Sequence, residues 1–167
     1  GDVRKHGSGN IGATNVSRVA GKGVGLLVLL LDITKGLVPV LLARRWGLPE
    51  PFWPWIGLAA VAGHVFSPWL GFKGGKGVAT YLGVLAGLAW KVALIFAAIW
   101  LAIAFFTRYS SLAALTAALA VPIALFFMGF GDYAVLFAAL TAIVYWKHRT
   151  NISRLVGGTE SRIGAKG

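Results

Sequence analysis

Long apolar runs constrain the fold of this 167-residue chain more than any other feature of its sequence. The first run, Val24–Ala43, has roughly the 20 residues that an α-helix needs to cross a bilayer, and short polar segments separate it and the later runs. The mean hydropathy of +0.77 and the hydrophobic share of 57% both exceed what soluble domains show. The sequence therefore predicts an all-α, polytopic transmembrane bundle that forms a single domain over residues 1–167.

The hydropathy pattern predicts four spans directly and leaves one longer run to interpret. The four spans are expected at Val24–Ala43, Phe52–Leu70, Ser111–Met128 and Tyr133–Trp146. The longer run, Val78–Phe106, is apolar except for Lys91 near its middle. It is either one long span or two short ones.

The distribution of basic residues favours two short spans that fold back at Trp90–Lys91. With this hairpin, twelve of the sixteen Lys and Arg residues share the face of the N-terminal segment and three lie opposite, while Lys35 falls within a span. A single span would change the split to six against eight. Cytoplasmic loops carry the excess of Lys and Arg. We therefore expect six spans, including short or broken helices.

This topology places four polar clusters on one face: Asp2–Asn15, Lys73–Lys76, Arg108–Ser111 and His148–Arg154. The first lies in Gly1–Lys22, which is expected to be a polar loop. The net charge of +11 would suggest nucleic acid if it lay on a soluble face. Because the basic residues lie between apolar runs, anionic lipid or an anionic substrate is expected instead, and no nucleic acid.

A glycine-rich segment, LGFKGGKGVAT at Leu70–Thr80, predicts an anion site. Glycines let backbone N–H groups converge on a ligand, and a helix predicted from Gly77 would direct its N-terminus at an anion. Lys73 and Lys76 would then contact a phosphate. The alternative is a flexible basic loop between two spans. No cysteine is present, which excludes disulfides, thiolate metal sites and a cysteine nucleophile.

Five motifs together resemble one family, the membrane-integral acyl-phosphate:glycerol-3-phosphate acyltransferases of bacterial phospholipid synthesis. The motifs are GSGNIGATN (7–15), LDITKGLVP (31–39), GHVFSPWLGFKGGKGVAT (63–80), RYSSL (108–112) and HRTNISRL (148–155). The resemblance covers nearly the whole chain in the family's motif order. The family has seven spans, and this sequence begins just after the first, so six remain. The resemblance implies a multi-pass protein of the bacterial cytoplasmic membrane with its active site on the cytoplasmic face.

The resemblance implies acyl transfer from acyl phosphate to the 1-hydroxyl of glycerol 3-phosphate, giving lysophosphatidic acid and phosphate. It implies no cofactor or metal, contact with membrane lipids, and a monomer. It places the phosphate of glycerol 3-phosphate near Ser8, Arg18, Lys76 and Ser111, and the reacting hydroxyl or acyl phosphate near His148 and Asn151. Lys76, Ser111, His148 and Asn151 are the expected catalytic residues. Further substrate contacts are expected at Asn10, Thr14, Asn15, His64, Lys73, Gly74, Gly75, Gly77 and Ser110.

Several of these residues also have a structural interpretation. Asp32 and Lys35, spaced i,i+3, are favoured as a structural ion pair over an acid–base pair. His64 could pack in the protein interior, and Arg18 could anchor the chain at the membrane face. Gly83 is expected on a small-residue packing face. At the level of function, the alternative is a transporter or channel for phosphate-bearing solutes, although the two halves show no internal repeat.

The proton acceptor does not follow from a motif. No His-x₄-Asp sequence is present, and His148 has basic neighbours and no carboxylate nearby in sequence to orient it. The hypothesis is therefore substrate assistance, in which a phosphate oxygen accepts the proton of the attacking hydroxyl.

Overall fold

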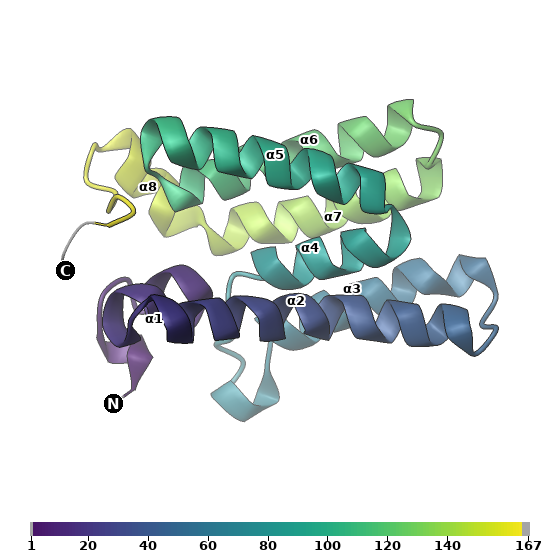
Figure 1. Ribbon diagram of the computed structural model, residues 1–167, viewed down its shortest axis with the longest axis horizontal. Helices are drawn as coiled ribbons and strands as arrows, with labels where there is room; N and C mark the ends of the chain where they lie inside the picture. Colours follow the sequence, from purple (N-terminus) through teal and green to yellow (C-terminus); the bar gives the residue numbers. More distant parts are fainter. Residues whose placement is uncertain (1, 165–167) are drawn as a thin grey trace.

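The computed structural model describes residues 2–164, and the regular secondary structure of this part of the chain consists of helices alone (Figure 1). Among the described residues, α2, α5 and α6 are each long and apolar enough to cross a membrane, and α4 is a shorter apolar helix. The elements, in chain order, are η1 (Val3–Lys5), α1 (Ala13–Ala20), α2 (Lys22–Arg45), η2 (Glu50–Phe52), α3 (Trp53–Val65), η3 (Pro68–Leu70), α4 (Val78–Leu88), α5 (Trp90–Thr107), α6 (Ser110–Phe127), α7 (Gly131–Lys147) and α8 (Arg149–Val156).

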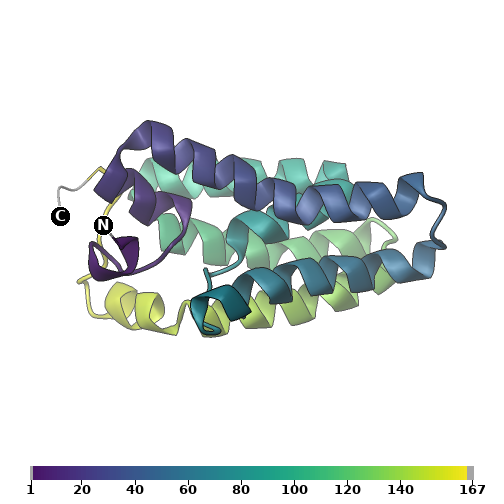
Figure 2. The same ribbon diagram turned by 90° about the horizontal axis from the view of Figure 1, so that it is seen from below.

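The six helices from α2 to α7 alternate in direction, so that the first and last described segments lie at the same end of the bundle (Figures 1 and 2). The predicted fold-back of the long apolar run is confirmed. Helix α4 ends at Leu88 and α5 begins at Trp90, with Ala89 between them in a non-helical conformation (φ −148°, ψ 73°). The turn therefore lies one residue before the predicted Trp90–Lys91.

Helix α3 ends at Val65, so the expectation of a span reaching Leu70 was wrong. The cause is Pro68, because a proline disfavours helical backbone in the residue before it. Ser67 is accordingly not helical (φ −56°, ψ 118°). The chain then forms the short η3 turn, which projects from the side of the bundle, and returns to begin α4 (Figure 1).

The expectation of a polar loop over Gly1–Lys22 was also wrong in part, because Ala13–Ala20 form α1. This helix packs against α2, as Figure 2 shows. Its buried Asn15 holds the preceding segment in place. The side-chain oxygen of Asn15 accepts from the Ser8 N–H at 2.8 Å, and its amide nitrogen donates to three backbone carbonyls, those of Val3, His6 and Asn10.

Helices α2 and α4 pack with their backbones in close contact. A Cβ atom on Gly36 would lie under 3.0 Å from the Thr80 carbonyl oxygen, and one on Gly83 would lie under 3.0 Å from the Ile33 carbonyl oxygen. The predicted packing role of Gly83 is thus confirmed. This contact fixes α4, and with it the loop that precedes α4, against the first long helix.

The hydrophobic core is centred on Tyr81 of α4. Its ring meets the edge of Phe137 at a centroid distance of 4.9 Å and an interplanar angle of 85°. Its hydroxyl donates to the Ala118 carbonyl at 3.2 Å and lies 3.0 Å from Thr141 Oγ1. Tyr81 thereby joins α4 to α6 and α7 in the interior of the bundle.

Candidate active site

A cavity of about 340 Å³ lies in the half of the bundle that contains the two described chain ends. Four segments that are far apart in sequence form its polar wall. They are α1 with the residues before it, the start of α4, the start of α6, and the α7–α8 junction together with the residues that follow α8. The polar wall consists of Ser8, Asn10, Thr14, Asn15, Arg18, Lys76, Gly77, Ser110, Ser111, His148, Asn151 and Glu160. The four polar clusters that were expected on one face thus meet at one cavity.

Three of the expected contacts in the glycine-rich segment do not line this cavity. Lys73 is exposed, and Gly74 and Gly75 pack against His64 instead. A Cβ on Gly74 would lie under 3.0 Å from the His64 carbonyl oxygen. A Cβ on Gly75 would also lie under 3.0 Å from a ring atom of His64. The Gly74 N–H donates to the Val65 carbonyl at 3.1 Å. These two glycines therefore let the loop lie flat against the end of α3.

Lys76 is the residue of this loop whose charge faces the cavity. It precedes Gly77, whose positive φ of 83° allows the chain to turn into α4. The Lys76 ammonium donates to Asn151 Oδ1, so the loop is tied to α8. Burial, together with the positive charge of Arg154, lowers the pKa of Lys76 to about 8. Lys76 is therefore still mostly protonated at neutral pH.

Arg18 carries the second positive charge in the cavity wall and has no carboxylate within 4.0 Å among the described residues. Its guanidinium donates only a long bond of 3.5 Å to the Ser161 carbonyl. Its Nε is buried without a hydrogen-bond partner. A guanidinium with a buried, unpaired N–H and no carboxylate partner is suited to bind an oxyanion.

His148 lies at the end of α7 with its imidazole buried against the cavity. Its Nδ1 is 2.7 Å from the Val144 carbonyl oxygen, which can only accept, so Nδ1 carries the hydrogen. Burial and the nearby Lys76 charge lower the pKa of His148 to about 4. The imidazole is therefore neutral at physiological pH, with Nε2 available as a hydrogen-bond acceptor.

Glu160 is a cavity residue that sequence reasoning did not single out. Its side chain is only 5% exposed, and its carboxylate accepts from Ser111 Oγ at 2.9 Å, Asn151 Nδ2 at 2.7 Å and Arg154 Nε at 2.7 Å. Burial alone would raise the pKa of Glu160, but these hydrogen bonds outweigh burial and lower it. The one available signal was its position as the single acidic residue of the basic tail 147–167.

A hydrogen bond of 3.0 Å between Thr14 Oγ1 and Ser110 Oγ joins α1 to α6 across the cavity wall. Both residues were expected as substrate contacts, and both line the cavity. The two residues are 96 positions apart in the chain. Their bond therefore holds the polar cluster before and within α1 against the polar cluster at the start of α6.

Further from the chain ends, Asp32 and His64 also line the cavity. Lys35 Nζ lies 2.9 Å from Asp32 Oδ1, so the expected ion pair is formed. His64 Nδ1 lies 3.6 Å from the same oxygen, which is too long for a hydrogen bond. His64 thus packs against the loop glycines on one side and faces the cavity on the other.

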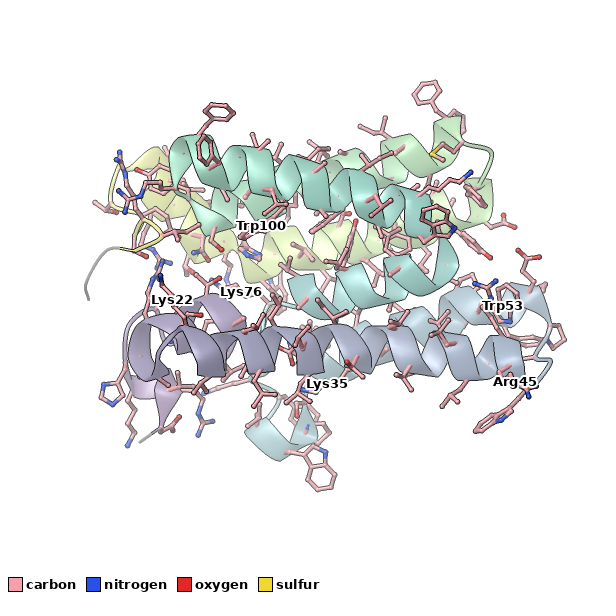
Figure 3. All side chains as sticks on the ribbon, viewed as in Figure 1. Lys22, Lys35, Arg45, Trp53, Lys76 and Trp100 are labelled. Atoms are coloured by element: carbon pink, nitrogen blue, oxygen red, sulfur yellow. The ribbon has the colours of Figure 1, made fainter. Side chains whose placement is uncertain are left out.

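The remaining wall of the cavity is apolar and extends between α2 and α5. It was not predicted, because its residues belong to ordinary span sequence. In Figure 3, Trp100 and Lys76 lie in the half of the bundle near the chain ends, whereas Arg45 and Trp53 lie at the far end. Leu101 is 63% exposed and also lines the cavity, so the apolar wall reaches the outer surface of the bundle. The larger apolar residues of this wall are Leu29, Ile33, Leu82, Phe96, Trp100 and Leu101.

No group of three or more His, Cys, Asp or Glu side chains within residues 2–164 is arranged to hold a metal ion. The polar groups that line the cavity are two cations without a carboxylate partner among the described residues, two imidazoles, hydroxyls, amides and two carboxylates that are each paired with another cation.

The chain is similar to known proteins over its full length. The family model described as glycerol-3-phosphate acyltransferase matches residues 1–158. A glycerol-3-phosphate acyltransferase of Mesorhizobium japonicum is 65% identical over 167 residues, which cover all of this chain and 85% of that protein. A protein of the same description from Brucella anthropi is 58% identical, covering all of this chain and 82% of its own length.

Two crystal structures of PlsY (YgiH), an integral membrane glycerol 3-phosphate acyltransferase, have the same fold. The glycerol 3-phosphate form matches with a TM-score of 0.92 and 43% identity, over 98% of this chain and 83% of the other. The lysophosphatidic acid form matches with a TM-score of 0.87 and 43% identity, over 94% of this chain and 81% of the other.

Proposed function

Since this chain belongs to the glycerol-3-phosphate acyltransferase family, it is an integral membrane enzyme with several spans that produces lysophosphatidic acid, and we propose that it takes the acyl group from an acyl phosphate bound in the cavity described above. Family membership also decides against the alternative of a transporter or channel.

The observation that carries this proposal is the surplus of positive charge at the polar wall. Asp32 is paired with Lys35 and Glu160 with Arg154, so both carboxylates of the cavity are neutralised by residues other than Arg18 and Lys76. Two unneutralised cations suit two phosphate groups, one on glycerol 3-phosphate and one on the acyl donor. A phosphate leaving group also needs positive charge near it as charge develops.

The apolar wall between α2 and α5 supplies the matching site for a fatty acyl chain. Because Leu101 is exposed on the outer surface and lines the cavity, the fatty acyl chain can enter sideways from the bilayer while the phosphate of the donor stays at the polar wall. Glycerol 3-phosphate enters from the cytoplasmic end. The acyl carbon then lies at the boundary of the two walls, within reach of the attacking hydroxyl.

The donor is tested with purified protein in detergent, glycerol 3-phosphate and a series of donors. We expect acyl phosphate to give lysophosphatidate and inorganic phosphate in equal amounts, because Lys76 and Arg18 stabilise a leaving phosphate. A thioester carries no phosphate on its acyl carbon for Arg18 and Lys76 to bind, so it should be a much poorer donor. Acyl-CoA or acyl-carrier-protein thioester that served as well as acyl phosphate would contradict the donor assignment.

The proton of the attacking hydroxyl passes to a phosphate oxygen in this proposal, and His148 orients the hydroxyl through its bare Nε2. With a pKa of about 4, the imidazole is a weak base. His148→Asn should therefore keep measurable turnover, because asparagine retains a hydrogen-bond acceptor. Its rate profile should also keep the wild-type shape between about pH 5.5 and 7.5. A folded His148→Asn protein that binds both substrates without any turnover would identify His148 as the base.

We infer that α2 to α7 are six membrane spans and that the polar wall of the cavity faces the cytoplasm of a bacterial cell. Single cysteines are clean probes of this topology, because the chain has no cysteine of its own. Cysteines at Lys5, Lys73, Arg108 and Arg154 should react with a membrane-impermeant reagent only from the cytoplasmic side. A cysteine at Lys91 should react only from the opposite side. Labelling of any two of the first four positions from different sides would exclude the topology.

A further inference from the structure

Two basic side chains flank one tryptophan on the outer surface of the bundle, where α7 ends and α8 begins (Figure 1). The Lys147 ammonium lies 5.7 Å from the centroid of the Trp146 ring, and the Arg149 guanidinium carbon lies 5.0 Å from it. Both distances are within the range of cation–π attraction. Neither Lys147 nor Arg149 lines the cavity. This cationic pair is therefore separate from the polar wall, although His148 stands between the two residues in the chain.

The cationic pair has no counter-ion in the described part of the chain, since no carboxylate there lies within 4.0 Å of either residue. Two like charges held against one ring repel each other, so an anion that contacts both is favoured. The Arg149 guanidinium donates from Nη1 to the Trp146 carbonyl at 3.0 Å, and its other N–H groups are left for a ligand. A guanidinium and an ammonium side by side suit a phosphate group.

The surroundings of the cationic pair favour the phosphate of a lipid over a free phosphate. Trp146 is half exposed at the end of α7, and its ring lies 6.1 Å from that of Phe66, which is exposed at the end of α3. Exposed aromatic rings at helix ends lie at the headgroup level of a bilayer, where cytoplasmic Lys and Arg residues meet anionic lipids. Along the same face of α7, the exposed side chains are small and apolar, so an acyl chain has room beside the helix. They are Ala142, Ala138 and Val135.

We propose that Trp146, Lys147 and Arg149 bind the headgroup of an anionic phospholipid of the surrounding membrane. Its phosphate accepts hydrogen bonds from Arg149 and contacts the Lys147 ammonium, while one acyl chain follows α7. Because Arg149 also donates to the Trp146 carbonyl, the bound lipid braces the one-residue junction between α7 and α8. That residue is His148, whose imidazole faces the cavity. The lipid composition of the membrane thereby acts, from outside the bundle, on a segment that carries a site residue.

Native mass spectrometry of the protein in neutral detergent measures the binding of single lipids, with phosphatidylglycerol as the anionic lipid and phosphatidylcholine as the neutral one. Wild type should bind one phosphatidylglycerol at least about fivefold more tightly than phosphatidylcholine. Lys147→Gln and Arg149→Gln should each weaken this binding by about fivefold, the effect of one cation beside an anionic headgroup. Lys5→Gln is the matched control, because Lys5 is an exposed cation of η1 at the same end of the bundle. It should change the affinity by less than about twofold.

Hydrogen exchange tests the brace, since the Ile152 N–H donates to the His148 carbonyl at 2.8 Å at the start of α8. Phosphatidylglycerol at about twice its Kd should slow exchange of peptide 145–155 about threefold in wild type and leave it unchanged in Lys147→Gln. Equal affinity for the two lipids, a loss in Lys5→Gln as large as in Lys147→Gln, or unchanged exchange with lipid bound would overturn the proposal. Neither measurement uses glycerol 3-phosphate or an acyl donor, so failure of the acyl phosphate assignment would be seen separately.

Discussion

Lys76→Ala should lower kcat/KM for glycerol 3-phosphate by roughly 30- to 1,000-fold. This range corresponds to the 2–4 kcal/mol that a buried, charge-assisted contact in a transition state typically contributes. Lys76 is one of two cations in the cavity wall without a carboxylate partner among the described residues, and its ammonium also holds Asn151 by the side-chain oxygen. The substitution therefore removes a charge and frees an orienting amide together. Steady-state kinetics with acyl phosphate as donor measure the effect.

Lys91→Ala is the control for loss of one lysine, because Lys91 is exposed at the far end of the bundle. It should change kcat/KM by less than about threefold. Lys76→Ala kinetics within the same threefold of wild type would remove the loop before α4 from the mechanism.

Gly74→Ala should lower kcat/KM by about 100-fold, although Gly74 does not line the cavity. A Cβ at this position would lie under 3.0 Å from the carbonyl oxygens of His64 and Val65, which are backbone atoms and cannot rotate away. The loop must then move off the end of α3, and Lys76, two residues further on, moves with it. A displacement of about 1 Å at a positioning group costs on the order of 100-fold in rate.

Gly63→Ala is the matched control for Gly74→Ala. Gly63 lies in α3 next to His64, and a Cβ there would meet no atom within 4 Å. It should keep wild-type kinetics and elute as the same monodisperse species. Kinetics are normalised to folded protein from size-exclusion chromatography, so that misfolding is not counted as lost activity. Normal kcat/KM in folded Gly74→Ala would show that the loop tolerates the displacement.

The helical bundle could be predicted in large part because its signals are local. The lengths of the apolar runs and the sidedness of the Lys and Arg residues are properties of contiguous sequence, and they placed α2, α6 and α7 to within two residues at each end. The premature end of α3 is a case where a local signal was available but was outweighed. Pro68 indicated a break, yet the apolar residues after it extended the predicted span.

The site was less predictable, because the same pattern serves two physical purposes. Gly74 and Gly75 were expected to cradle a phosphate, and a glycine is equally required where another part of the chain occupies the space of its Cβ. Only the fold shows that His64 occupies that space. Glu160 was not predicted as a site residue for a related reason, since its partners Ser111 and Asn151 come from separate helices and form no motif with it.

The exposed position of Leu101 at the end of the apolar wall has a kinetic consequence. Under the proposed function, an acyl phosphate that enters sideways between α2 and α5 is dissolved in the bilayer at the moment of encounter. The quantity that governs saturation is then the mole fraction of acyl phosphate among the surrounding lipids, and bulk molarity has no direct meaning. Lysophosphatidate is released into the same two-dimensional solvent. The rate of turnover therefore depends on the aqueous concentration of glycerol 3-phosphate and on the surface density of acyl phosphate in the membrane.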